Sequence, residues 1–256
     1  MHRTGIFRSS ALVVFVNYAG VPLLVVYFVA MFAFPWVDGK GTWVDVQSVW
    51  DRWQTLNAGA LAFMASLVAF NISRFNENRQ REREFVAAKA FLPSTLSGLM
   101  EYFSRSALVY SRLWESSGRT PSPLNRPDLP SGYREVFSNC IRHADPEVGS
   151  YLSNILVCLQ VHDARLRAGV SQSQNAQTRS VDGHTLIAYL YSLGQLYALV
   201  SKFFGFARDE ELFQGTSLSW DDFRTAYRVM GLEIEDIFIN EQMNLRAFTE
   251  RAISRS

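Results

Sequence analysis

Histidine, cysteine and carboxylate side chains are the candidates for chemistry in this chain, and few of them stand in a known pattern. The sequence contains four histidines and two cysteines. Two pairs, His162 with Asp163 and His143 with Asp145, have the residue types of metal ligands. Neither pair belongs to an HExxH motif or to the Glu-x-x-His spacing of a carboxylate-bridged metal site. We therefore expect no metal and no cofactor.

The environment predicted for the same residues favours a structural role. His162 falls on the apolar stripe of a predicted helix beside Leu159 and Leu166, which is typical of a hydrogen-bonded core histidine, although a pH switch stays open. Cys140 and His143 would share a helix face, but a thiol nucleophile also needs an orienting group and an oxyanion site. We interpret both cysteines as reduced and buried, and we expect no catalytic residue among these groups.

Two acidic clusters, Asp209-Glu210-Glu211 and Glu233-x-Glu235-Asp236, fit loop and helix-start charges better than a catalytic carboxylate pair. No GxxxxGK[ST], GxGxxG or GxSxG motif occurs. Residues 74–256 hold 21 Lys/Arg and 21 Asp/Glu, so this part has no electrostatic footprint for nucleic acid. The sequence favours a protein without an enzymatic site and leaves an enzyme as an alternative.

The elements that would position any site divide into an apolar part and a polar part. Residues 53–73 carry no formal charge and would form a helix about 31 Å long, enough to cross a bilayer. A second charge-free run, 9–37, precedes it and contains Gly20 and Pro22, which favour a kink or tilt. The prediction is a transmembrane hairpin over 1–73, with spans at about 10–36 and 53–73. We favour an uncleaved anchor over a signal peptide for the first run.

Small side chains recur along one face of the second predicted span. They are Ala58, Ala62, Ala65, Ser66 and Ala69. Such a stripe lets two helix backbones approach closely in a membrane. It predicts a membrane packing face, used either for self-association or as the groove that receives the first span.

Four of the six tryptophans cluster around the connection between the two spans. They are Trp36, Trp43, Trp50 and Trp53. Indole rings favour the boundary between headgroups and hydrocarbon, so the sequence predicts an interfacial belt in a Trp-rich external loop. Thr42 and Asp45, at capping-box spacing, predict that an amphipathic helix begins there.

Basic residues flank the hairpin on one side. Arg3 and Arg8 precede it, and five Lys/Arg lie within the first sixteen residues after it, whereas the loop carries three aspartates. The positive-inside rule then places both termini in the cytoplasm. The expected partners are the lipid bilayer and either a second copy of the chain or another protein, with no nucleic acid.

Residues 74–256 are predicted to form a cytoplasmic all-helical domain of about five helices. The spacing predicts a break near Pro93, helices over 133–143, 146–167 and 233–253, and a helix capped by Ser219, which Gly231 ends. Four prolines mark a loop at 116–132. The charge-free run 185–201 fits a buried core helix or a third span, and we favour the core helix. The predicted fold class is all-α, a two-helix transmembrane hairpin followed by a helical bundle.

One resemblance accompanies these patterns. The run Trp53-Gln54-Thr55-Leu56-x-Ala58-Gly59-x-Leu61-Ala62, followed by a basic flank and by Phe91-Leu92-Pro93, resembles a segment of small proteobacterial inner-membrane proteins. The resemblance covers roughly residues 50–105. It implies a location in the bacterial inner membrane and implies no reaction; the multi-pass topology follows from the two predicted spans.

The sequence leaves three classes of function open. We favour a membrane-anchored interaction or sensory module of unspecified partner. The first alternative is a homo-oligomeric pore or membrane-perturbing effector that uses the small-residue face. The second is an enzyme acting near the membrane face, with His143, His162 or the acidic clusters as site residues.

Overall fold

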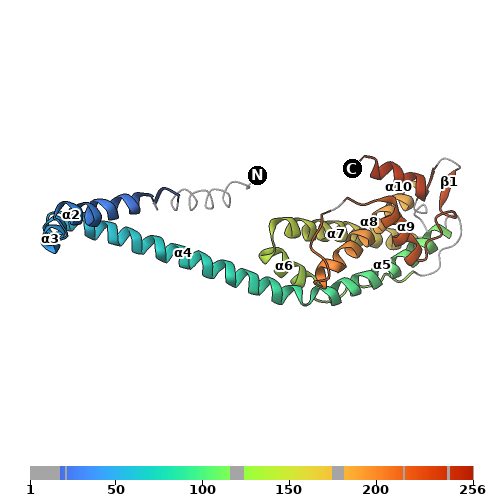
Figure 1. Ribbon diagram of the computed structural model, residues 1–256. Helices are drawn as coiled ribbons and strands as arrows, with labels where there is room; N and C mark the ends of the chain where they lie inside the picture. Colours follow the sequence, from blue (N-terminus) through green and yellow to red (C-terminus); the bar gives the residue numbers. More distant parts are fainter. Residues whose placement is uncertain are drawn as a thin grey trace. The chain divides into compact units, whose positions relative to one another are not determined.

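The computed structural model describes residues 18–20, 22–115, 124–174, 182–215, 217–240 and 243–255. The described residues form an all-α fold with one very short strand pair. The chain forms two compact units, residues 1–76 and 77–256. Two helices, Tyr18–Asp38 and Gln54–Lys89, are long and apolar enough to cross a membrane by length and composition. Figure 1 shows the elements with their labels.

The first unit is a pair of helices joined by a short helical connection. The first helix contains a π-helical turn, η1 (Val29–Ala33), and ends as α2 (Phe34–Asp38). Pro35 cannot donate to a carbonyl one turn back, and the π turn lies directly before it. A connecting helix follows, α3 (Trp43–Arg52), and then α4 (Gln54–Lys89) begins.

A few close contacts hold this pair together. Tyr27 Oη donates to Asn57 Oδ1 at 2.8 Å, and Asn57 Nδ2 donates to the carbonyl of Trp50 at 3.2 Å. Gly20 is buried, and a Cβ there would lie 3.5 Å from Leu67 Cδ1. The small residue at the helix contact is therefore Gly20, on the first helix.

The small-residue face of α4 is distinct from the face that is buried in the described part of the chain. Its five members, Ala58, Ala62, Ala65, Ser66 and Ala69, are all exposed within one chain. Within residues 54–73 of α4 the buried or half-buried positions are Asn57, Ala60, Met64 and Leu67, which follow a different face of the same helix. Among the described residues the close approach between the two helices is made at Gly20, and the use of the small residues as a groove for the first helix stays a prediction. Their use in self-association stays a prediction.

The four tryptophans have two different surroundings. Trp36, Trp43 and Trp53 are 45–62% exposed, and the rings of Trp36 and Trp43 lie 6.0 Å apart. Trp50 is half-buried against Phe32, with ring centroids 5.0 Å apart. The interfacial belt at a bilayer stays a prediction for all four.

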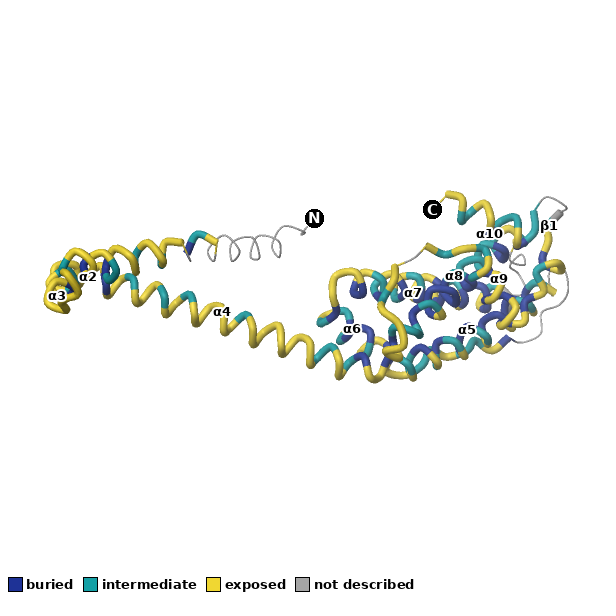
Figure 2. The backbone as a smooth tube through the Cα atoms, viewed as in Figure 1, coloured by how far each residue is buried: buried dark blue, intermediate teal, exposed yellow. Residues whose placement is uncertain are grey.

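The second unit is a bundle built around one central helix. After α4 come α5 (Leu92–Glu115), α6 (Tyr133–His143), α7 (Pro146–Gln174), α8 (Gly183–Ala207), α9 (Trp220–Val229) and α10 (Leu245–Ile253). α8 packs against α5, α7, α9 and α10. Figure 2 shows the buried residues gathered along α5, α7 and α8.

α8 resolves the ambiguity of the charge-free run 185–201. Twelve of its residues are buried in the bundle, and it is not one of the two helices apolar enough to span among the described residues. A helix apolar on most sides is stable in water only when neighbours cover it, and here four helices do so. The core-helix prediction is confirmed, and the third span is not.

Several predicted boundaries are confirmed. α4 ends at Lys89 and α5 begins at Leu92, so the chain breaks beside Pro93 as expected. α6 has the predicted bounds, and Ser219 forms a capping box with Asp222 at the start of α9. α7 is longer than predicted because the helix runs through Gly169, a buried residue on which a Cβ would lie 3.5 Å from Leu113 Cδ1.

The predicted helix over 233–253 is wrong in its first half. Residues 233–237 form a turn, and β1 (Phe238–Asn240) pairs antiparallel with β2 (Met243–Asn244). α10 starts only at Leu245, because Asn244 Oδ1 accepts the amide of Ala247 at 2.7 Å as an N-cap. The apolar residues before it face the core from a turn and not from a helix: Ile237 is buried there.

The tightest approach in the bundle lies between α8 and α9. A Cβ on Gly194 would sit 2.5 Å from Cε1 of Tyr227, a ring that is fully buried. We expect Gly194→Ala to lower the free energy of unfolding of the full chain in detergent by about 1–3 kcal/mol, because overpacking forces buried groups to shift.

Gly169→Ala is the matched control, measured by the same chemical denaturation. Its Cβ would have ordinary contact distance to Leu113, and alanine has the higher helix propensity. We expect no loss of stability there. Equal destabilisation by both changes would contradict the packing of α8 on α9.

Candidate functional site

The end of α4 is fastened to the bundle by charged side chains. Arg81 Nε donates to the carbonyl of His143 at 3.0 Å, and Arg81 Nη2 donates to the carbonyl of Ala144. These carbonyls lie at the C-terminal end of α6, where a cation is favoured by the helix dipole. One turn further along α4, Glu84 Oε2 lies 3.0 Å from His143 Nδ1.

A second attachment follows at the last residue of α4. Lys89 is buried, and its ammonium group pairs with the carboxylate of Asp209 just beyond α8. The same ammonium lies 4.0 Å from the ring centroid of Phe206, within cation–π range. Phe85 adds an aromatic contact to Phe206 at 6.4 Å. We call Arg81, Glu84, Phe85 and Lys89, with their partners, the α4 junction.

A groove lies beside the α4 junction. It has a volume of about 500 Å³. Its apolar wall is made by Ala87, Ala88, Phe91 and Val136. Its polar groups are Glu84, Glu135, Asn139 and His143. This groove lies entirely within the second unit.

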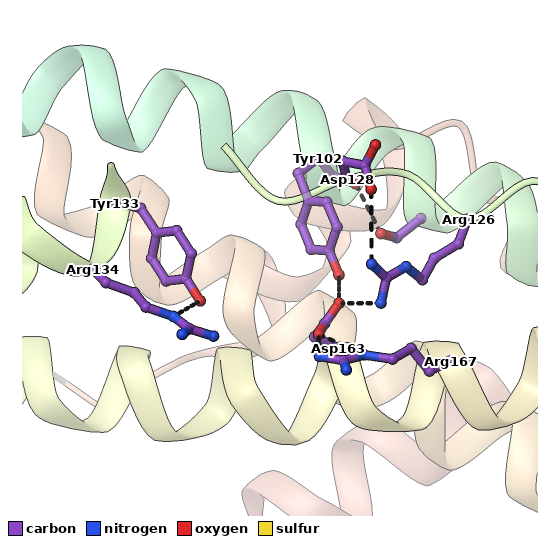
Figure 3. Close-up of polar contacts among 8 residues, drawn as sticks. Tyr102, Arg126, Asp128, Tyr133, Arg134, Asp163 and Arg167 are labelled. Atoms are coloured by element: carbon purple, nitrogen blue, oxygen red, sulfur yellow. Dashed lines mark hydrogen bonds and ion pairs between the residues drawn. The ribbon is translucent and has the colours of Figure 1, made fainter. Parts of the chain in front are cut away.

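A separate polar cluster surrounds Asp163, inside the bundle (Figure 3). Asp163, on α7, is 3% exposed at its side chain. Its carboxylate accepts hydrogen bonds from Tyr102 Oη of α5 at 3.2 Å and from Arg126 Nη1 at 3.5 Å. Arg167, one turn along α7, donates to the other carboxylate oxygen through two nitrogens.

The Asp163 cluster satisfies its own charges. Hydrogen bonding to Asp163 raises the pKa of Arg167, and burial, then the negative charge of Asp163, raise the pKa of the Tyr102 phenol. Neither group would exchange a proton near neutral pH. Because Arg126 belongs to segment 124–130, which has no regular secondary structure, the cluster ties that segment to α7, which is a structural role.

His162 is a core residue, but it lacks the predicted hydrogen bond. Its ring packs at 5.7–6.3 Å against Tyr102, Phe103 and Tyr110, in edge-to-face contacts. Neither ring nitrogen has a hydrogen-bond partner among the described residues. Burial lowers the pKa of His162 to about 4, so the imidazole is neutral at physiological pH.

The other candidates from the sequence are scattered. Cys140 is buried, and burial raises the pKa of its thiol to about 11, which opposes a nucleophilic role. In the described part of the chain, no three His, Cys, Asp or Glu side chains form a group that could hold a metal ion. Asp209 belongs to the α4 junction, whereas Glu233 and Glu235 line a separate groove near α9.

Comparison of the chain with protein-family models, with curated proteins and with solved structures finds no match. The function must therefore be argued from the α4 junction and its surroundings. The junction was not found from the sequence, because its pairs join residues up to 120 positions apart.

The environment of His162 predicts an acid-sensitive bundle. Its pKa is about 4 in the folded chain and near 6.5 when unfolded, so the unfolded chain binds a proton first as pH falls. We expect the free energy of unfolding to decrease by on the order of 3 kcal/mol as pH falls from 6.5 to 4 through this residue alone. Denaturation of His162→Phe across this window should show a correspondingly smaller pH dependence.

His184→Gln is the control, because His184 is an exposed residue at the start of α8. Its pH dependence should match that of the unaltered chain. If His162→Phe and the unaltered chain lose the same stability between pH 6.5 and 4, His162 is not buried in its neutral form.

Proposed function

We propose that this protein is a membrane-anchored helical interaction or sensory module. In this proposal residues 10–36 and 53–73 cross the bacterial inner membrane as a hairpin, and residues 74–256 form a cytoplasmic bundle. Support comes from the two long apolar helices and from the contacts of Tyr27 and Gly20 with the second of them. The arginines flanking the hairpin favour cytoplasmic termini.

The continuity of α4 is the observation that carries the proposal. This helix runs without interruption from Gln54 to Lys89, 36 residues. Its first part is apolar, and its last part holds the α4 junction. An unbroken backbone ladder resists bending, so a rotation or shift of the apolar part would act on Arg81 and Glu84 and through them on α6.

The chemistry of the bundle supports a module better than an enzyme. The buried charge of Asp163 is neutralised by its own neighbours, and the His162 nitrogens are enclosed by the core. A reaction needs a titratable group that reaches a substrate. The groove beside the α4 junction has room for a ligand, which suits a sensory role.

Self-association is a second candidate, favoured by the exposed small-residue face. In the described part of one chain Ala58, Ala62 and Ala69 are exposed. Two copies could approach along this face, since small side chains permit close helix packing in a membrane. A pore or membrane-perturbing effector would require this assembly, whereas the module does not.

The mass and composition of the particle extracted in mild detergent test the proposal. We expect light scattering to give a monomer or dimer, with mass spectrometry identifying a second protein that elutes with it. The variant Ala62→Leu should leave that association unchanged, because Ala62 is outside the hairpin contact. Ala60→Leu is the matched control that crowds the half-buried face.

One outcome would contradict the module, and a second would restrict it to its sensory form. A homo-oligomer of four or more chains with no other protein, converted to monomers by Ala62→Leu, would establish the pore or effector instead. A bare monomer that elutes with no partner would remove support for an interaction module and leave ligand sensing as the remaining form of the proposal.

A further inference from the structure

The groove between α4 and α6 combines an apolar wall with negative charge. Ala87, Ala88, Phe91 and Val136 form the wall, and residue Phe91 is 63% exposed to solvent. Its volume of about 500 Å³ falls within the range of pockets that hold small organic molecules.

The side chains that line the groove carry an excess of negative charge. Glu84 and Glu135 both line the groove, and no lysine or arginine does. Glu84 is paired with His143, whereas Glu135 has no ion-pair partner within 4.0 Å among the described residues. Asn139 adds an amide to the polar part of the lining. An occupant that matches this lining has a cationic end and a short apolar body.

We propose that this groove binds a small amphipathic amine, a protonated alkylamine being its simplest form. The ammonium group would pair with Glu84 and Glu135, and the alkyl chain would cover Phe91 and Val136. The inference deepens the sensory form of the proposed function and rests on it, since it names the class of ligand that the bundle would sense.

Binding at this place would act on the α4 junction. Glu84 is both a lining residue and the partner of His143, at 3.0 Å. An ammonium group on Glu84 competes with His143 for the same carboxylate. Of the polar contacts described between α4 and the end of α6, those of Arg81 would remain, so the ligand would loosen one of the two polar attachments of α4 to α6.

The test uses the full chain in nanodiscs of phosphatidylcholine with n-hexylamine as the probe. Ligand-observed saturation-transfer NMR measures binding, and n-hexanol serves as the uncharged analogue of the same length. We expect saturation transfer to n-hexylamine above that of empty nanodiscs. The affinity for n-hexanol should be at least fivefold weaker, because hexanol lacks the charge that pairs with the carboxylates.

Two variants test separately whether binding depends on the negative charge and on the open volume of the groove. Glu135→Gln should weaken n-hexylamine binding about fivefold, and Ala87→Phe should abolish it by filling the groove. Glu82→Gln is the matched control, because Glu82 is an exposed residue of α4 that does not line the groove. It should bind as the unaltered chain does. Circular dichroism of each variant checks that the fold is retained.

Several outcomes would overturn the inference. They are equal binding of n-hexanol and n-hexylamine, equal weakening by Glu82→Gln and Glu135→Gln, or binding of a basic amphipathic peptide without binding of n-hexylamine. The module itself fails on a different measurement, the composition of the detergent particle. Loss of amine binding with a partner still present would therefore reject the ligand and retain the module.

Discussion

The structure depends on one constraint, that α4 must be a stable helix in two surroundings. Its first twenty residues carry no charge, and its last sixteen carry eight charged side chains. A helix exposed in this way gains little from its own propensity and needs outside contacts to persist. Tyr27, Gly20 and Leu67 supply them in the first unit. Arg81, Glu84 and Lys89 supply them in the second, and each of these three is attached to the end of another helix.

The second unit is organised by a different constraint, the burial of the apolar helix α8. That helix is apolar on most sides but is not one of the two described helices apolar enough to span a membrane, and four neighbouring helices bury it. Two polar residues in the same core, Asp163 and His162, have opposite surroundings. Asp163 is surrounded by donors, whereas His162 stays neutral and unpaired among aromatic rings in the described part of the chain, which costs stability when the unfolded chain can take up a proton.

Periodicity was sufficient to predict most of the helices, because each buries a stripe that the sequence displays locally. The spacing predicted α6 at its observed bounds, and the cap at Ser219 marked the start of α9. Local patterns could not decide which face of α4 meets the first helix, since the deciding residue, Gly20, lies on the partner. They also missed the turn before α10, where Asn244 begins the helix. The α4 junction and its groove arise from pairs distant in sequence, such as Lys89 with Asp209, and no local signal could reveal them.

The central claim is that α4 continues unbroken from its apolar part to the junction. Hydrogen–deuterium exchange of the full chain in nanodiscs tests it most directly, resolved to the amides of residues 74–79. In a continuous helix each of these amides donates to the carbonyl four residues earlier. We expect them to exchange at least about tenfold more slowly than in the variant Gln80→Pro, in which the ladder is broken. Exchange at the same rate in both chains would show a hinge there and would contradict mechanical coupling between the apolar helices and the bundle.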